Sequence, residues 1–501
     1  MADPFYITTA IHYPNGRPHI GHAYEMIAAD AIARFQRQQG RDVFFQTGTD
    51  EHGLKMVQTA RARDMTAREL ADEMSSHFRV MAEKLDISCD RFIRTSEADH
   101  YRASQAIWEK MASKGDLYLD RYEGWYSVRD EAFYEEKELQ EGEGGQKLSP
   151  QGTPVEWTKE ETWFFRLSKY QQPLLDFYAA NPDFIRPESR RNEVLRFVEG
   201  GLVDLSVSRT SFDWGVPVPG SPGHVMYVWV DALTNYLTGA GFPDDAERLA
   251  RYWPADLHLI GKDIVRFHTV YWPAFLMSAD IALPKQVFGH GFLLNRGEKM
   301  SKSVGNVVDP MELAETYGVD ALRYFLLRDV SFGQDGTFSD EAIVTRANAD
   351  LSNSFGNLAQ RTLSFIAKNC EGAVQAGRAE EADAVLLTEV DTACAAFTRA
   401  FEDLALSQGA EAWMTGVFAC NQYIDAQAPW TLRKTDPERM HAVLGTLLKA
   451  IRRLGMTIEP VVPTSAAKLL AQLGPEGNAD FKIAAPTPIF PRLELQASED
   501  A

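Results

Sequence analysis

The sequence predicts an α/β fold, in which a doubly wound parallel sheet carries an insertion and is followed by an α-helical bundle. Three observations predict this arrangement. Apolar runs enclose a helical pattern over residues 5–47, the periodicity is poor and glycine is common over residues 115–216, and apolar residues recur at helical spacing from about Ser339 onward. A chain of 501 residues with 45% hydrophobic content is long enough for several domains, each with its own core.

The first half of the sheet is expected in residues 1–114. Residues 5–11 form an apolar run, apolar residues recur at helical spacing over residues 24–35 until Gly40, and residues 42–47 form a second apolar run. A strand, a crossover helix and a parallel strand make a right-handed βαβ unit. We therefore predict a Rossmann-like sheet, whose ligands bind beyond the carboxyl ends of its strands.

The second half of the sheet is expected in residues 217–294. Three short apolar runs, each leading into a polar or glycine-containing turn, are interpreted as its strands: residues 223–232, 256–263 and 285–291. The intervening residues 115–216 are interpreted as an insertion between the two halves of the sheet.

The segment Pro18–His22 lies where the first strand ends and the helix begins. Unpaired N–H groups and the positive end of the helix dipole favour a polyphosphate there, and His19 and His22 can each donate a hydrogen bond to it. Gly21 leaves room for a ligand to approach the backbone. Taken alone, the pattern also fits two surface histidines at a helix start. Asp50, beyond the second strand, is placed to hold a substrate ammonium, or else caps a helix or turn.

A second motif, Lys299–Ser303, follows much later in the chain. Together with Pro18–His22 it resembles the two signature motifs of the class I aminoacyl-tRNA synthetases, in the same order. The resemblance implies that ATP is used with Mg²⁺, and that His19, His22, Lys299 and Lys302 are catalytic because they stabilise its phosphates. Chemistry at a phosphoryl centre needs positioning and charge neutralisation more than a dedicated acid or base, which agrees with this residue set.

The resemblance sharpens to the methionyl-tRNA synthetases in residues 227–232 and 261–268. It implies an ATP site formed by Tyr13, Pro14, Asn15, Gly16, His19, Gly21, His22, Gly261, Asp263, Lys299, Met300, Ser301, Lys302 and Ser303. It also implies a methionine site formed by Ile11, Tyr13, Asp50, Trp229, Ala232, Tyr236, Ile264 and His268. Such a wall suits a thioether, which packs well against aromatic rings. His12 and Leu233 stand where the family often has proline, a departure that bears on affinity.

Within the insertion, residues 122–131 resemble the stretch in which many members of this family place a zinc knuckle, but residues 115–216 contain no cysteine. Structural zinc normally takes four Cys or His ligands at close spacing, so we predict a form of the family without zinc. Packing is expected to supply the stabilisation that the metal supplies in relatives. The four cysteines of the chain are scattered and are expected to be free thiols.

Residues 295–338 resemble the lysine-rich loop and connector of the family, and residues 339–501 its α-helical anticodon-binding domain and tail. The resemblance assigns the reading of the anticodon to Asn357, Arg361 and Trp430. Unpaired bases are recognised by stacking on aromatic rings and by hydrogen bonds to their edges, so these residue types are suitable. Singly, each residue also fits an ordinary place on a helix surface or in a core.

The resemblance implies a methionine–tRNA ligase of protein biosynthesis, which attaches L-methionine to tRNA(Met). The reaction forms methionyl-adenylate with release of pyrophosphate, then transfers the methionyl group to the 3′-terminal adenosine with release of AMP. No apolar stretch is long enough to span a bilayer and the start lacks a secretory signal, so a cytoplasmic protein is expected. The dimerising module that some relatives append does not follow the tail, so a monomer is expected. The net charge of −20 by itself gives tRNA no support, because nucleic-acid binding depends on Lys and Arg.

Three other functions fit part of the pattern. A synthetase for isoleucine, leucine or valine shares both motifs, but resembles much longer chains with an inserted editing domain. A small-molecule nucleotidyltransferase shares the histidine turn but leaves the helical region unexplained. A catalytically silent tRNA-binding protein would keep Asn357, Arg361 and Trp430 and would need neither signature motif.

Overall fold

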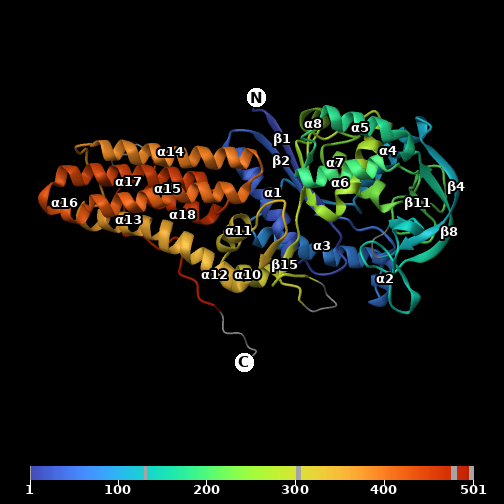
Figure 1. Cartoon of the computed structure of the whole chain (residues 1–501), viewed down its shortest axis with the longest axis horizontal. Helices are drawn as coiled ribbons and strands as arrows, with labels where there is room; N and C mark the ends of the chain where they lie inside the picture. Colours follow the sequence, from blue (N-terminus) through green and yellow to red (C-terminus); the bar gives the residue numbers. More distant parts are fainter. Residues whose placement is uncertain (1, 129–131, 301–305, 476–481, 496–501) are drawn as a thin grey trace. The chain divides into compact units, whose positions relative to one another are not determined.

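A computed structural model of the chain describes residues 2–128, 132–300, 306–475 and 482–495 (Figure 1). The chain forms two compact units. Unit 1 consists of residues 1–29, 39–83 and 87–290, and unit 2 of residues 30–38, 84–86 and 291–501. The helix α1, Ile20–Gln38, contributes residues to both units.

Unit 1 contains a six-stranded sheet in the order β3-β2-β1-β13-β14-β9, and every pair of neighbours is parallel. Its strands are β1 (Pro4–His12), β2 (Asp42–Thr49), β3 (Arg91–Arg94), β9 (Ile185–Arg186), β13 (Leu257–Gly261) and β14 (Val287–His290). The chain moves outward from β1 to β3 and later returns to the other side of β1. The strand order therefore reverses between β1 and β13, where open α/β sheets bind their ligands.

The predicted parallel α/β sheet is confirmed, and its opening strand, helix and second strand are β1, α1 and β2. The helices that accompany this sheet in the first 290 residues are α2 (Leu54–Ala62), α3 (Ala67–Lys84), α4 (Ala98–Ser113), α5 (Gln171–Ala180), α6 (Glu188–Glu199), α7 (Val228–Gly239), α8 (Ala246–Tyr252) and α9 (Trp272–Ser278). One apolar cluster joins Tyr6 and Phe44 of the sheet to Trp108 of α4, Leu233 of α7 and Phe275 of α9. These three helices therefore pack against the sheet.

The prediction of a sheet strand over residues 223–232 is wrong. Only Val225–Met226 is extended there, as β12, and it pairs with β11 (Ser208–Arg209) outside the six-stranded sheet. Residues from Val228 onward form α7, in which every residue except Trp229 is buried. A helix buried on all sides has no polar face, so its apolar run cannot be distinguished from a buried strand by periodicity.

Residues 115–216 contain a separate antiparallel sheet in the order β10-β8-β4-β5. Its strands are β4 (Leu117–Ser127), β5 (Ala132–Tyr134), β8 (Glu156–Phe165) and β10 (Leu205–Ser206), and a short ribbon of β6 (Gln140–Glu141) and β7 (Lys147–Leu148) lies between them in the chain. The same range also supplies α5, α6 and β9. One of the two edge strands of the six-stranded sheet, β9, therefore comes from within this range.

Unit 2 begins with a small sheet of β15 (Leu293–Asn295), β16 (Glu298–Lys299) and β17 (Gly336–Phe338). Its helices are α10 (Pro310–Tyr317), α11 (Val319–Arg328), α12 (Asp340–Arg346), α13 (Asn357–Asn369), α14 (Glu381–Glu402), α15 (Leu406–Gln427), α16 (Pro429–Thr435), α17 (Pro437–Ile458) and α18 (Pro463–Leu473). The long helices α14, α15 and α17 pack side by side, which confirms the predicted bundle (Figure 1). Asp309 caps the start of α10, where its side chain accepts a hydrogen bond from the Met311 N–H at 2.8 Å.

A π-helix, η6 (Ala347–Gly356), joins α12 to α13. The buried residues Ile343, Ala347, Leu351 and Phe355 are spaced four apart along this stretch. An α-helix has 3.6 residues per turn, so a strict spacing of four drifts around it. The i→i+5 bonds of a π-helix include more residues in each turn, and all four of these side chains are buried.

None of the helices in the described part of the chain combines the length and the apolar character that a membrane crossing requires.

One buried ion pair joins four separate segments of unit 2. Arg323 of α11 is fully buried, and its Nη2 donates to Oδ2 of Asp30 in α1 at 2.7 Å. Its remaining N–H groups donate to backbone carbonyls of Leu85, which follows α3, and of Pro460 and Val461, which follow α17. A buried guanidinium is stable only when its donors are matched in this way.

We expect Arg323→Met to lower the free energy of unfolding by about 3–5 kcal/mol, because it leaves the Asp30 carboxylate buried without this partner. Urea denaturation followed by circular dichroism measures the change. Arg63→Met is the control: the side chains of its pair with Glu73 are 42% and 38% exposed, so its removal should cost no more than about 1 kcal/mol. Equal losses in the two variants would contradict the assignment of a structural role to Arg323.

Candidate active site

The two histidines of Pro18–His22 lie at the start of α1 and hold each other in place. The His19 N–H donates to Nδ1 of His22 and the Gly21 N–H donates to Nδ1 of His19, both at 3.1 Å. The rings are stacked with their centroids 3.8 Å apart. Because each Nδ1 is an acceptor, each neutral ring has its proton on Nε2. The arrangement therefore offers two Nε2–H donors beside the N-terminus of a helix, which suits an anion.

Gly21 is required by this arrangement. A Cβ atom at this position would lie 2.9 Å from Cε1 of His19. Any side chain here would therefore displace the His19 ring from its place over His22.

The segment from Tyr13 to Gly16 forms a turn between β1 and α1. The Asn15 N–H donates to the Tyr13 carbonyl oxygen at 3.0 Å, and the Tyr13 hydroxyl accepts from the Met56 N–H at 3.1 Å. Pro14 is buried, while Tyr13, Asn15 and Gly16 are half-buried. The backbone of the turn is thus fixed next to the two histidines.

Asp50 is buried directly after β2, and its N–H donates to the carbonyl oxygen of His12 at the end of β1, at 2.9 Å. Ile11 and Tyr13 lie on either side of His12. The His12 ring packs against the rings of Phe78 and His22, with centroids 5.5 and 5.0 Å away, and burial lowers its pKa. Asp50 thus directly follows β2, and its N–H is bonded to His12, the last residue of the neighbouring strand β1.

Aromatic and imidazole rings from α7 and the segment after β13 form an uncharged wall. Trp229 stacks on Phe267 with the ring centroids 3.8 Å apart and an interplanar angle of 8°. His268 Nδ1 donates to the Ile264 carbonyl oxygen at 2.9 Å, so its Nε2 accepts from the Tyr236 hydroxyl at 2.7 Å. Burial lowers the pKa of His268 to about 4, which keeps the ring neutral. Ala232 is buried on the same helix as Trp229 and Tyr236.

The third strand end, at β13, holds Gly261 and Asp263. Asp263 lies in η4 (Lys262–Ile264) and is exposed. A Cβ atom on Gly261 would lie 2.6 Å from Oδ1 of Asp263, so only glycine lets this carboxylate fold back over the strand end. An exposed carboxylate at the point of strand reversal can accept hydrogen bonds from sugar hydroxyls.

The second motif lies in unit 2. Lys299 is the last residue of β16, where it is paired with Leu294 of β15, and Met300 follows it. Ser301, Lys302 and Ser303 lie outside the described residues. Unit 1 therefore contains all the other predicted ATP and methionine residues, and unit 2 contains this segment.

A buried cluster in unit 1 was not predicted from the sequence. The Asp231 carboxylate of α7 accepts from Nδ1 of His52 at 2.5 Å and from Nε2 of His100 at 2.6 Å. Burial alone would raise the pKa of Asp231, but His52 and His100 lower it to about 2. Asp231 and His52 are 179 positions apart, so no local pattern relates them. Their only signal in the sequence is that Asp231 directly precedes the predicted ligand residue Ala232 and that His52 lies two residues after Asp50.

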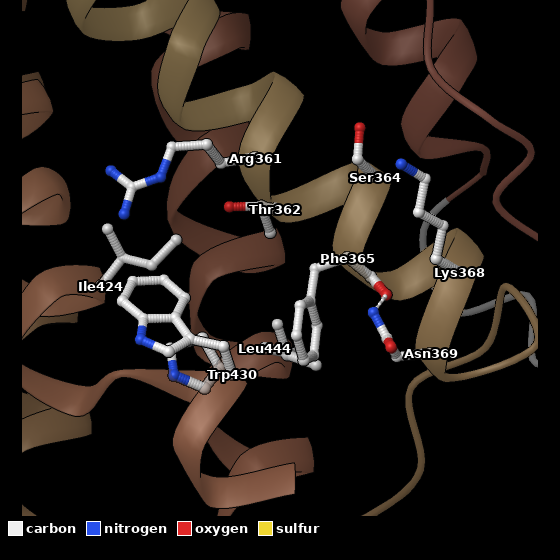
Figure 2. A pocket seen from close by; sticks show the side chains of 10 residues that line it. Arg361, Thr362, Ser364, Phe365, Lys368, Asn369, Ile424, Trp430 and Leu444 are labelled. Carbon is white, nitrogen blue, oxygen red and sulfur yellow. Dashed lines mark hydrogen bonds between the residues drawn. The ribbon is translucent and has the colours of Figure 1, made fainter.

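Of the three residues predicted to read the anticodon, the structure brings Arg361 and Trp430 together. Arg361 and Trp430 line a cavity of about 260 Å³ between α13 and α16, with Phe365, Lys368 and Leu444 (Figure 2). The Arg361 guanidinium lies 5.3 Å from the centre of the Trp430 ring and forms an ion pair with Asp425 at 2.7 Å. Trp430 is 43% exposed. Asn357, one turn before Arg361 on α13, is exposed.

Two departures from the family pattern occupy defined places. Leu233 is buried in the apolar core of unit 1, and His12 is buried between Phe78 and His22. Neither position disturbs the backbone hydrogen bond between His12 and Asp50. Within the described part of the chain, no three His, Cys, Asp or Glu side chains are grouped as metal ligands. All four cysteines are free, with Cys394 and Cys420 buried and the other two half-buried.

The fold and the paired motifs define a class I tRNA synthetase, and a family model described as "tRNA synthetases class I (M)" matches residues 5–363. A second model, "Anticodon binding domain of methionyl tRNA ligase", matches residues 374–486. The chain belongs to the methionyl-tRNA synthetase family.

Similar proteins match over nearly their whole length. The methionine–tRNA ligases of Brucella suis and Mycobacterium tuberculosis are 58% and 56% identical to this chain, with 99% and 98% of both chains covered. A solved structure of the Mycobacterium tuberculosis methionyl-tRNA synthetase in complex with methionyl-adenylate gives a TM-score of 0.94 at 56% identity, covering 98% of this chain and 100% of that chain.

The neutral state of His268 predicts a pH dependence of stability. Its pKa is about 4 in the folded protein, against about 6.5 for an unperturbed histidine, so the unfolded chain takes up the proton first as the pH falls. The contribution of the neutral ring is complete above about pH 6.5 and is lost towards pH 4, a loss of roughly 3 kcal/mol. We expect His268→Gln to have a shallower fall in unfolding free energy between these pH values. Denaturation curves at several pH values test this, and equal slopes in the two proteins would contradict it.

Proposed function

We infer that this chain attaches L-methionine to tRNA(Met) in two steps. In the first step the methionine carboxylate attacks the α-phosphate of ATP, used as its Mg²⁺ complex, and pyrophosphate leaves. In the second, the 2′-hydroxyl of the terminal adenosine of the tRNA attacks the carbonyl carbon of the methionyl-adenylate, and AMP leaves. The observation that carries this proposal is that unit 1 presents the histidine pair and the Asp50 carboxylate on segments that follow its parallel strands, together with a neutral aromatic wall formed by α7 and the segment after β13.

The proposed phosphate-binding groups come from both motifs. His19 and His22 donate from Nε2, and Lys299 and Lys302 supply positive charge as the phosphates gain negative charge. The phosphate side of the ATP site is completed by the backbone and side chains of Tyr13, Pro14, Asn15, Gly16, Gly21, Met300, Ser301 and Ser303. Gly261 and Asp263 are proposed to hold the ribose, whose two hydroxyls can donate to one carboxylate.

The proposed methionine site combines one charge with an apolar wall. Asp50 and the carbonyl oxygen of Ile11 bind the substrate ammonium, and Ile11 and Tyr13 help to surround the methionine side chain. The thioether is surrounded by Trp229, Ala232, Tyr236, Ile264 and His268. The neutral state of His268 supports this assignment, because a charged ring would disfavour an apolar side chain.

The tRNA is proposed to place unpaired anticodon bases at the cavity between α13 and α16. The exposed Trp430 ring offers a stacking surface, and Arg361 and Asn357 can bond base edges. The ion pair with Asp425 supports this reading, because it orients the guanidinium beside the ring before any RNA binds.

We propose that the protein works without zinc, as a monomer in the cytoplasm. Two observations support the proposal that no zinc is bound. Residues 115–216 lack cysteine, and aromatic packing stabilises their sheet. Trp125 and Trp157, on paired strands, lie 5.3 Å apart between ring centroids, and Lys147 lies over the Trp125 ring at 4.6 Å.

Amino-acid-dependent exchange of pyrophosphate into ATP, measured without tRNA across all twenty amino acids, tests the activation step. We expect a signal confined largely to methionine. A stronger exchange signal with another amino acid would refute the proposed methionine site but not the assignment to class I synthetases. The absence of any signal would instead favour a tRNA-binding protein without catalysis.

The anticodon assignment predicts that Trp430→Ala raises the KM for tRNA(Met) in aminoacylation by roughly ten- to a hundredfold, since stacking of one base contributes about 1–3 kcal/mol. Trp157→Ala is the matched control, because Trp157 is similarly exposed but lies on β8. Pyrophosphate exchange without tRNA reports whether the active site of each variant is intact. The assignment is refuted if the two variants have the same KM for tRNA.

A further inference from the structure

The turn of residues 50–53, which we name the Asp50 turn, is fixed through its backbone. The Asp50 N–H donates to the His12 carbonyl oxygen at 2.9 Å, and the Glu51 N–H donates to Oγ1 of Thr95 at 2.8 Å. The Glu51 carbonyl oxygen accepts from Nε1 of Trp214 at 2.5 Å. These bonds attach the turn to β1, to Thr95 after β3 and to Trp214. None of them reaches α7.

The side chain of His52 makes the direct connection to α7. Its Nδ1 donates to Oδ2 of Asp231 at 2.5 Å, and its Nε2 accepts from the Tyr101 hydroxyl at 3.0 Å. His52 and Asp231 are 1% and 0% exposed, so water does not compete for this bond. A buried, charge-assisted hydrogen bond of this length fixes the separation of the two elements that it joins.

Asp231 lies in the middle of the proposed methionine wall. Ala232 is the next residue along α7, Trp229 is two residues earlier, and Tyr236 is about one turn later. Asp50, which is proposed to bind the ammonium, lies two residues before His52. The two ends of the amino acid would therefore be bound by different elements, and the His52–Asp231 bond determines how far apart those elements lie.

We propose that His52 and Asp231 are positioning residues, which hold the Asp50 carboxylate at the distance from the α7 wall that methionine requires. This inference rests on the proposed function. Neither residue touches the substrate. Their effect is on methionine binding alone, because the histidine pair and the strand end at β13 do not depend on this bond.

His100 provides a matched comparison. It donates to the other oxygen of the same carboxylate at 2.6 Å and is equally buried, but it belongs to α4. No residue of α4 is proposed to bind methionine or ATP. Loss of His100 therefore removes an equivalent bond from Asp231 without releasing the Asp50 turn.

The experiment compares His52→Ala with His100→Ala in methionine-dependent pyrophosphate exchange. We expect the KM for methionine to rise about tenfold or more in His52→Ala, since displacement of a positioning group by an ångström is enough to weaken binding strongly. The KM for ATP should stay unchanged in both variants, and the KM for methionine should stay unchanged in His100→Ala. Both variants should lose thermal stability, because each leaves Asp231 with one partner fewer.

Conservative variants keep the test decisive if an alanine variant does not fold. The amide nitrogen of asparagine lies where Nδ1 of His52 lies, whereas that of glutamine lies near Nε2. We therefore expect His52→Asn to keep the normal KM for methionine and His52→Gln to raise it.

Three results would overturn the proposal: an equal rise in the KM for methionine in the His52 and His100 variants, no rise in either, or no difference between His52→Asn and His52→Gln. Wild-type protein without methionine-dependent exchange would refute the proposed function itself, and is thereby distinguished from failure of the positioning role alone.

Discussion

Buried carboxylates with matched donors connect the distant segments of this chain, and each unit depends on them. Asp231 joins α4, α7 and the Asp50 turn in unit 1. Asp30 joins α1 to Arg323 of α11 in unit 2, and Asp383 of α14 accepts from Arg439 of α17 at 2.6 and 2.7 Å. A charge without its partner in such a place is strongly destabilising, so these pairs restrict which segments can meet. Apolar packing alone would tolerate small shifts between the same helices.

The parallel sheet explains why the site residues are so dispersed in sequence. Each parallel strand ends at the same edge of the sheet, so β1, β2 and β13 deliver the residues that follow them to one place. What the strands cannot determine is the state of the groups delivered. Backbone donors set the tautomers of His19 and His22, and burial with a carbonyl acceptor sets that of His268. Imidazole is thus held as an Nε2–H hydrogen-bond donor at one strand end and as a neutral packing group near another.

The sequence was sufficient to predict β1, α1 and β2. The period of the apolar residues changes there within one short segment, and polar positions mark the boundaries. It failed at α7, where burial on every side removes the period. The spacing of four over residues 343–355 indicated a helix but not the π-helical turns of η6. The His52–Asp231–His100 cluster was beyond reach for a different reason: its members lie 179 and 131 positions apart, and only the completed fold brings them together.

The cavity beside Trp430 has a further consequence for the choice among RNA molecules. It presents Arg361 and Lys368 on a chain whose formal charge is −20, so most of the molecular surface repels a polyanion. An RNA that approaches elsewhere gains little from counterion release and leaves quickly. If the cavity receives the anticodon as proposed, discrimination begins before any base is read, as a difference in the lifetime of encounters. Background acidity and a local cationic cavity would together act as a kinetic filter against the many RNAs that the protein must ignore.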